Sequence, residues 1–314
     1  MSHNGGIRCL VTGATGHLGA ALARLLVRRG HPTAVFVRPS GDRWRLASIR
    51  NHLQFIEGSL SDLAPAEHAL RQFAPEAVFH LAWGGVTRES RDSAYHIRVN
   101  LTGGLRIVDL ACDLRCRVFI GLGSQAEYGP SNSPLTEDTP ARPDTAYGLA
   151  KLCLGQLALK QCEVSGVRAV WLRPLATYGP QDDERRLIPY VISCLLRGES
   201  PVLSAGTQRW DYLYSEDAAE AILTAALCES VSGAFNLAHG EAWTIRQIAA
   251  VLRDQLSPHA ILEWNSQPSR SLLGSSRRFS AITGWQPHVG MEEGLLRTAH
   301  WYKEHFVAHE SPNL

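Results

Sequence analysis

Three side chains in the middle of the chain have types and a spacing that could carry proton transfer. Ser124 lies in GSQAEYG directly after an apolar run, and Tyr147 and Lys151 follow in YGLAK. On a helix, Tyr147 and Lys151 at positions i and i+4 would lie on one face. A hydroxyl, a phenol and an ammonium placed together could exchange protons with a substrate oxygen. The same residues would also fit a strand end, a turn and a surface helix, so the elements around them must decide.

Three glycines near the N-terminus have the spacing of a phosphate-binding turn. Gly13, Gly16 and Gly19 stand in TGATGHLG, which follows a predicted strand directly and opens a predicted helix. Residues without side chains allow a tight turn, a close approach of the backbone to a pyrophosphate and close packing of helix on strand. The anion would then face the N-terminus of the helix. This position predicts a dinucleotide site rather than an ordinary glycine-rich turn.

The end of the second predicted strand bears on which dinucleotide binds. A unit of this kind that binds NAD carries Asp or Glu about 20 residues after the glycines, whereas arginine suits the 2′-phosphate of NADP. In VFVRPSGDRWRL that acid is absent, Arg38 takes its place, and Arg43 and Arg45 follow. A guanidinium neutralises a phosphate and can grip it with two hydrogen bonds. We therefore predict NADP over NAD, the alternative being a solvated basic loop.

Short apolar runs alternate with amphipathic stretches through the first half of the chain. The runs are rich in β-branched and aromatic residues and are too short for helices. Strands separated by helices form a parallel sheet that is covered on both faces. The sequence therefore predicts an α/β fold of the Rossmann type, a doubly wound parallel sheet with strands at 7–12, 32–38, 53–57, 77–82, 117–123 and 167–173.

The pattern changes after about Arg173. Helices are expected in RRLIPYVISCLL, SAITGWQP and MEEGLLRTAHWYKEHF, and short strands in RWDYLY and AFNLA. A capping box of Thr244 and Gln247 opens a further helix in TIRQIAAVLRDQL. We expect residues 1–173 to form the dinucleotide-binding domain. Residues 174–314 should form mainly a smaller substrate-binding lobe, with some segments returning to the sheet.

Composition excludes several classes of protein. The 314 residues carry 31 Lys and Arg against 30 Asp and Glu, without a block of like charge that would suit nucleic acid or a membrane surface. No apolar run approaches the roughly 20 residues that span a bilayer, and the N-terminus lacks the layout of a signal peptide. We therefore expect a cytoplasmic protein. Cys112 and Cys116 are four residues apart on a predicted helix, but no second ligand pair accompanies them, so we predict no metal site.

The motifs taken together resemble one protein family over nearly the whole chain. This family is the extended short-chain dehydrogenase/reductases (the NAD-dependent epimerase/dehydratase family), which comprises nucleotide-sugar epimerases, dehydratases and ketoreductases. The motifs are specific for the superfamily and fold, and much less so for the substrate. They are TGATGHLG, FHLAW at 79–83, the Asn100 of RVNLTGG, GSQAEYG, YGLAK, LRPLATYGP, RWDYLYSEDAA and TGWQP.

The resemblance implies a role for each of the three side chains. Tyr147 is the acid and base on a sugar oxygen, and Ser124 donates a hydrogen bond to the same oxygen. Because a free phenol has a pKa of about 10, it needs help near neutrality. The Lys151 ammonium and the charge of the cofactor would lower that pKa, and Lys151 also holds the nicotinamide ribose. We expect Asp144 to cap the helix that carries Tyr147 and Lys151.

The resemblance also implies which residues contact the two ligands. Arg209 is expected at the substrate pyrophosphate. The substrate-binding residues are Ser124, Gln125, Tyr147 and Arg209. The cofactor-binding residues are Gly13, Thr15, Gly16, His17, Leu18, Gly19, Arg38, Arg43, Ser59, Leu60, Leu81, Ala82, Trp83, Asn100, Tyr147, Lys151 and Pro174.

Departures from the family pattern narrow the reaction. The 4,6-dehydratases of the family carry an acidic pair directly after the hydroxyl residue, where this chain has Gln125 and Ala126. Neither can act as an acid or a base, so dehydration is not expected. Glu127 could reach the substrate and could equally be structural. No cysteine matches the Cys and His of the 3,5-epimerising reductases.

Three more positions depart from the pattern near the ligands. Ser59 replaces an Asp often used on the adenine, and Ala176 replaces an Asn often found against the substrate. Trp210 takes a common Arg position, where it could stack on a base or pack within the protein; packing is the expectation.

We therefore predict NADPH-dependent reduction of the C4 ketone of a nucleotide-linked 4-keto-6-deoxyhexose, a step of deoxysugar biosynthesis. An NAD-dependent nucleotide-sugar 4-epimerase is the alternative. A non-catalytic dinucleotide-binding regulator is a third reading, which the intact Ser124, Tyr147 and Lys151 oppose. In this family a helix such as 91–113 pairs with the helix of Tyr147 across a two-fold axis, so we expect a homodimer.

Overall fold

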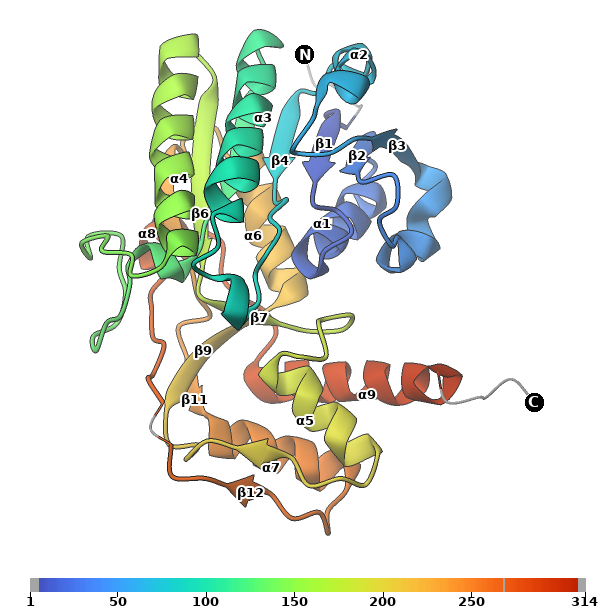
Figure 1. The fold of residues 1–314 in the computed structure, drawn as a ribbon, viewed down its shortest axis with the longest axis vertical. Helices are drawn as coiled ribbons and strands as arrows, with labels where there is room; N and C mark the ends of the chain where they lie inside the picture. The colour runs from blue at the N-terminus through green and yellow to red at the C-terminus, as the bar shows by residue number, and fades with distance from the viewer. Residues whose placement is uncertain (1–5, 268, 310–314) are drawn as a thin grey trace.

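A computed structural model describes residues 6–267 and 269–309 of the chain (Figure 1). Its main element is a 7-stranded parallel sheet in the order β10-β6-β5-β4-β1-β2-β3. The strand order reverses at β1, and in open α/β sheets such a point binds ligands at the carboxyl ends of the strands. The strands are β1 (Cys9–Thr12), β2 (Thr33–Val37), β3 (Leu53–Glu57), β4 (Ala77–His80), β5 (Val118–Leu122), β6 (Arg168–Pro174) and β10 (Gly233–Leu237).

Helices cover both faces of this sheet, which confirms the predicted Rossmann-type fold. Side chains alternate across each strand: Leu10 of β1 packs into one core cluster, whereas Cys9 and Val11 pack into the other. One face is covered by α1 (His17–Arg28) and α6 (Ser215–Leu227), and the other by α2 (Ala64–Phe73), α3 (Thr102–Asp113) and α4 (Ala146–Ser165).

A second group of elements lies beyond the carboxyl ends of the strands (Figure 1). It contains a 3-stranded sheet of β7 (Ala176–Tyr178), β9 (Arg209–Tyr214) and β11 (Ala242–Thr244). Its own apolar core joins this sheet to three helices. The helices are α5 (Leu187–Leu196), α7 (Ile245–Leu256) and α9 (Met291–His309), and β8 (Val202–Leu203) pairs with β12 (Glu263–Trp264) beside them.

The chain passes between the two groups more than once. α6 and β10 return to the large sheet after β9, and α8 (Arg277–Thr283) packs on β10 through Phe279 and Phe235, whose ring centroids are 5.8 Å apart. The predicted capping box is confirmed, because the Thr244 and Gln247 side chains each bond the backbone N–H of the other. Among the described residues, none of the helices is long and apolar enough to cross a membrane.

Three local expectations were wrong. Asp144 does not cap α4; Thr145 does, since its side chain accepts the Gly148 N–H at 3.1 Å. The predicted helix at 91–113 begins as a π-helical turn at His96–Leu101 and becomes α-helical at Thr102. Cys116 lies beyond the end of this helix, because the chain turns through Arg115, whose φ is 49°.

Candidate active site

The three candidate catalytic side chains come together at the carboxyl edge of the large sheet. Ser124 follows β5 and caps the short 3-10 turn Gln125–Glu127, while Tyr147 and Lys151 lie in the first two turns of α4. The Ser124 side chain lies close enough to the Tyr147 phenol to lower its pKa. The Lys151 Nζ donates to the backbone oxygen of Leu122, at the end of β5, at 2.5 Å. A hydroxyl, a phenol and an amine therefore meet where the fold binds ligands.

Burial perturbs the phenol and the amine in opposite directions. Burial raises the pKa of Tyr147, and the nearby Ser124 hydroxyl opposes this shift. Burial lowers the pKa of Lys151 to about 7, and the Glu127 carboxylate opposes that shift. Because the phenol stays protonated at neutral pH, it is poised as a proton donor. The lysine lies near the midpoint of its titration, so small changes around it change its charge.

Glu127 supports Ser124. The sequence left open whether this side chain reaches the substrate or is structural, and its contacts are structural. Its side chain is fully buried. One carboxylate oxygen accepts the Ser124 N–H and the Trp171 indole N–H, each at 2.9 Å, and the other accepts from Arg173 Nε at 2.7 Å. Arg173 also donates to the Tyr128 hydroxyl at 3.1 Å. This network fixes the turn that presents the Ser124 hydroxyl.

Sequence reasoning missed His96, a buried residue beside the candidate trio of Ser124, Tyr147 and Lys151. It begins the π-helical turn, a rare element that often occurs at functional sites. Its ring stacks on Trp83 with centroids 6.1 Å apart and lies edge-on to Tyr147 at 5.4 Å. Asn100, from the same turn, bonds the Gly84 backbone in both directions at 3.0 and 2.8 Å. A lone histidine four residues before Asn100 carried no signal in the sequence.

The glycine loop fits a dinucleotide pyrophosphate. Gly13 has φ of +76°, and a Cβ there would lie 2.5 Å from the Ala82 backbone nitrogen. A Cβ on Gly19 would collide with the Gly13 carbonyl oxygen, so both positions require glycine. α1 has no acidic residue in its first turn, and Gly16 offers no side-chain cap, so the first N–H groups are left for an anion.

The other expected cofactor residues surround the same edge. Leu81 and Ala82 follow β4 and bond Thr12 at the end of β1, at 3.1 and 3.3 Å. The Leu60 backbone lies against Gly103 of α3, and Pro174 ends β6. Ser59 bonds Ser61 through their hydroxyls at 2.8 Å, and Leu18 packs on the core beneath the loop.

The arginines after β2 are not equivalent. Arg43 pairs with Glu57 at 2.5 Å and lies over the Phe55 ring. Arg45 donates to the backbone oxygens of Gln181 and Thr15, at 2.8 and 3.3 Å. The Arg38 side chain is exposed and, within the described part of the chain, no hydrogen bond or ion pair holds it. Arg38 is therefore the guanidinium best placed to take a new anion.

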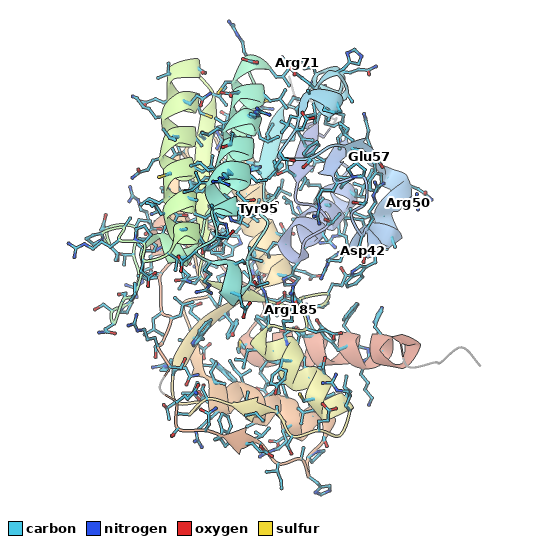
Figure 2. The ribbon with its side chains drawn as sticks, in the orientation of Figure 1. Asp42, Arg50, Glu57, Arg71, Tyr95 and Arg185 are labelled. Carbon is cyan, nitrogen blue, oxygen red and sulfur yellow. The ribbon has the colours of Figure 1, made fainter. Side chains whose placement is uncertain are left out.

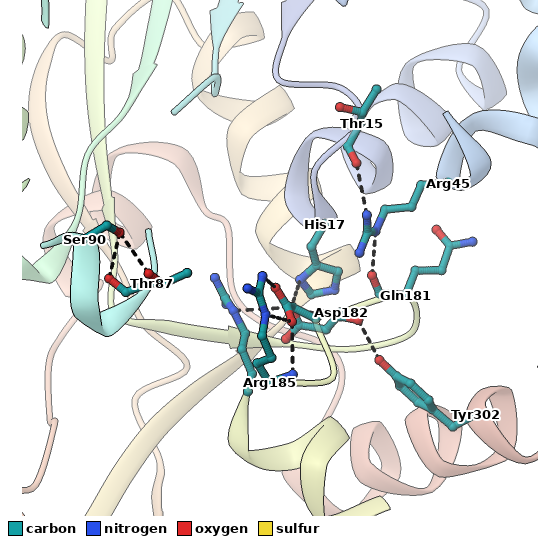
Figure 3. A network of polar contacts seen from close by, with 11 residues as sticks. Thr15, His17, Arg45, Thr87, Ser90, Gln181, Asp182, Arg185 and Tyr302 are labelled. Atoms are coloured by element: carbon teal, nitrogen blue, oxygen red, sulfur yellow. Dashed lines mark hydrogen bonds and ion pairs between the residues drawn. The ribbon is translucent and has the colours of Figure 1, made fainter. Parts of the chain in front are cut away.

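A polar network joins the glycine loop to the second group of elements (Figure 3). His17, the first residue of α1, places Nδ1 3.3 Å from the carboxylate of Asp182, and both side chains are nearly inaccessible to solvent. Burial lowers the pKa of His17 to about 4, so the imidazole is neutral at neutral pH. Asp182 lies between β7 and α5, and the Tyr302 hydroxyl of α9 donates to its backbone oxygen at 2.8 Å.

The segment that carries Asp182 is fixed from several sides. Gln181 has φ of 65°, a conformation that a non-glycine residue adopts only when its surroundings hold it. Arg24 of α1 donates to its side-chain oxygen at 2.7 Å, while Arg45 holds its backbone oxygen. Arg185, labelled in Figure 2 near the junction of the two groups of elements, has an exposed side chain that pairs with Asp183 of the same segment. The residues that would hold the pyrophosphate are thus tied to the strand and helix that follow β6.

The expected substrate residues lie on three elements: the 3-10 turn after β5, α4, which carries Tyr147, and β9. Gln125 follows Ser124 in the 3-10 turn. Arg209 begins β9 with its guanidinium on the Ala242 backbone oxygen at 2.8 Å. Trp210 packs on Tyr212 with ring centroids 5.6 Å apart and donates to the Arg270 backbone oxygen, so it packs within the protein as expected. Within the described residues, no group of three His, Cys, Asp or Glu is arranged to hold a metal ion.

The pattern of the NAD dependent epimerase/dehydratase family matches residues 9–238. This chain belongs to that family. A UDP-glucose 4-epimerase of Mycolicibacterium smegmatis is 26% identical over 95% of this chain and 99% of its own. A dTDP-glucose 4,6-dehydratase of Streptomyces griseus is also 26% identical, over 94% of both chains. A solved UDP-glucose 4-epimerase of Thermus thermophilus, in complex with NAD, is 27% identical with a TM-score of 0.83, over 95% of this chain and 99% of its own.

Membership makes this chain an enzyme of the extended short-chain dehydrogenase/reductase type that uses NAD(H) or NADP(H). Its relatives act on nucleotide sugars, as 4-epimerases and 4,6-dehydratases. Both the recognition of the family and the expectation of an enzyme are confirmed.

Proposed function

We propose that this enzyme reduces the C4 ketone of a nucleotide-linked 4-keto-6-deoxyhexose with NADPH. The observation that carries the proposal is that Ser124 lies beside Tyr147, with Lys151 one helical turn further along. When bound, the nicotinamide supplies the hydride. Ser124 and Tyr147 hold the ketone oxygen, Tyr147 gives it a proton as negative charge develops, and Lys151 supports the phenolate that remains.

The surroundings of Ser124 oppose a dehydratase reaction. Elimination of water needs a further acid and base beside the hydroxyl, and Gln125 and Ala126 can be neither. Glu127, the acid in this turn, is buried and occupied by Arg173, Trp171 and the Ser124 backbone. A carboxylate held this way cannot turn toward a substrate without leaving the Arg173 charge unpaired.

The proposed preference for NADPH rests on Arg38. It follows β2 directly, where NAD-binding units carry an acid. Arg43 is paired with Glu57 and Arg45 is bonded to the Gln181 backbone oxygen, so neither is as free to bind a phosphate. A phosphate would gain a charge-assisted contact there without breaking an existing one.

Two further parts of the proposal concern architecture. We propose that residues 1–173 form the dinucleotide-binding domain and that residues 174–314 mainly form the substrate-binding lobe, with Arg209 at the substrate pyrophosphate. We also propose a homodimer through α3 and α4. Leu149 and Leu157, two helical turns apart on α4, are about half exposed at 50% and 48%, which a two-fold contact would cover.

A 4-epimerase is the second candidate, favoured by the 26% identical epimerase and by the NAD in the Thermus thermophilus structure. The test is a panel of nucleotide-linked 4-keto sugars and hexoses, followed by the absorbance of the reduced nicotinamide and by product analysis. Loss of NADPH in step with a 4-keto substrate supports the reductase. Interconversion of two hexoses without net loss of reduced cofactor would establish the epimerase instead.

A further inference from the structure

Lys151 is a buried lysine whose ammonium faces an indole ring. The residue is 4% exposed, and its Nζ lies 3.9 Å from the centroid of the Trp83 ring. Its hydrogen-bond acceptor is the Leu122 backbone oxygen. An ammonium removed from water requires compensation, and the face of an indole is the strongest of the aromatic faces at attracting a cation. The Trp83 ring therefore supplies part of the stabilisation that water would give the ammonium.

The Trp83 ring is held in this place by His96. The indole N–H donates to His96 Nδ1 at 3.1 Å, and Asn100 Nδ2 lies 3.2 Å from the same nitrogen. Because Nδ1 accepts from these donors, the ring proton is on Nε2, which donates to the Ser90 backbone oxygen at 2.8 Å. The indole therefore cannot swing away from Lys151 without breaking a buried hydrogen bond.

We propose that Trp83 is a positioning residue whose ring face keeps Lys151 charged and beside Tyr147, with His96 fixing the ring. The inference rests on the proposed function, because it assigns Lys151 to the catalytic trio. Small changes around Lys151 change its charge near neutral pH, because burial lowers its pKa to about 7 and the Glu127 carboxylate opposes this shift. His80, which also faces Lys151, has its pKa lowered to about 3 by burial and by the lysine, so it stays neutral.

The sequence offers a direct test, because Lys151, Lys160 and Lys303 are its three lysines. Lysine labelled with ¹³C should give three side-chain signals whose pH titrations can be followed separately. We expect Trp83→Leu to lower the Lys151 midpoint by about 1.5 pH units, the size of a desolvated cation–π contact. Trp83→Phe, which keeps an aromatic face, should lower it by less than half as much. The exposed Lys160 and Lys303 serve as internal references.

The matched control is Trp264→Leu, which removes an indole that lies 4.6 Å from the Arg246 guanidinium in the other group of elements. It should leave the Lys151 titration unchanged. An unchanged midpoint in Trp83→Leu, or equal shifts in the Leu and Phe variants, would overturn the inference. Because the titration needs no turnover, it decides the role of Trp83 even if no keto sugar is reduced. Where turnover is found, the acid or base limb of its pH profile should move with the Lys151 midpoint.

Discussion

Replacing Glu127 by Gln tests whether the buried carboxylate is the support of the site. The Arg173 side chain is 11% exposed and its Nε bonds Glu127 at 2.7 Å, so the variant leaves a buried guanidinium without its counter-charge. Breaking a buried pair from one side typically costs about 3–5 kcal/mol. The Tyr128 hydroxyl, which also accepts from Arg173, offsets little of this because it is neutral at ordinary pH.

The assay for this variant is urea unfolding followed by circular dichroism. We expect the free energy of unfolding to fall by about 3 kcal/mol, with an unchanged dependence on urea. The double variant Glu127→Gln, Arg173→Met should recover part of the loss, because the unpaired charge is gone. Turnover should fall in both variants, since the Ser124 N–H then has at best a neutral amide oxygen as acceptor in place of a carboxylate. A single variant as stable as the wild type would refute this account of Glu127.

Three further predictions concern other parts of the molecule. Arg38→Asp should shift preference from NADP(H) to NAD(H), measured by titration calorimetry; equal wild-type affinities that the variant leaves unchanged would contradict the role of Arg38. His17 has a folded pKa of about 4 against 6.5 for a free histidine, so its contribution to stability is present above pH 6.5 and is lost as the pH falls toward 4. The free energy of unfolding of His17→Phe, measured against pH, should lack this loss, which is worth about 3 kcal/mol. The same dependence on pH in both proteins would be evidence against it. Leu149→Glu with Leu157→Glu should convert the dimer to monomers in light scattering at micromolar concentration, whereas a monomeric wild type would refute the dimer.

The features that sequence reasoning predicted are those with local signals. Strand runs such as 53–57, the glycine spacing and the Thr244/Gln247 box each follow from neighbours in the chain, although 53–57 is an edge strand rather than the buried strand expected. The cap of α4 was wrong by one residue, because Asp144 and Thr145 are both good N-cap residues and only the backbone conformation selects Thr145.

The features that it missed depend on contacts between distant segments. His96 meets Trp83 and Tyr147, and His17 meets Asp182, only after the strands align at the carboxyl edge of the sheet. Glu127 finds Arg173 because β5 and β6 are neighbours. None of these pairings has a sequence spacing that a periodic pattern could predict.

The most direct test of the central claim is the turnover of Tyr147→Phe on a nucleotide-linked 4-keto-6-deoxyhexose that the wild type reduces. The variant removes one hydroxyl and keeps the ring that packs edge-on against Trp83 and His96, so NADPH binding and thermal stability should persist and serve as controls. Because a positioned acid is typically worth about 10²–10⁴-fold, NADPH consumption should slow by at least about 100-fold. A variant that turns over this substrate at nearly the wild-type rate would contradict the assignment of Ser124, Tyr147 and Lys151 as the catalytic residues.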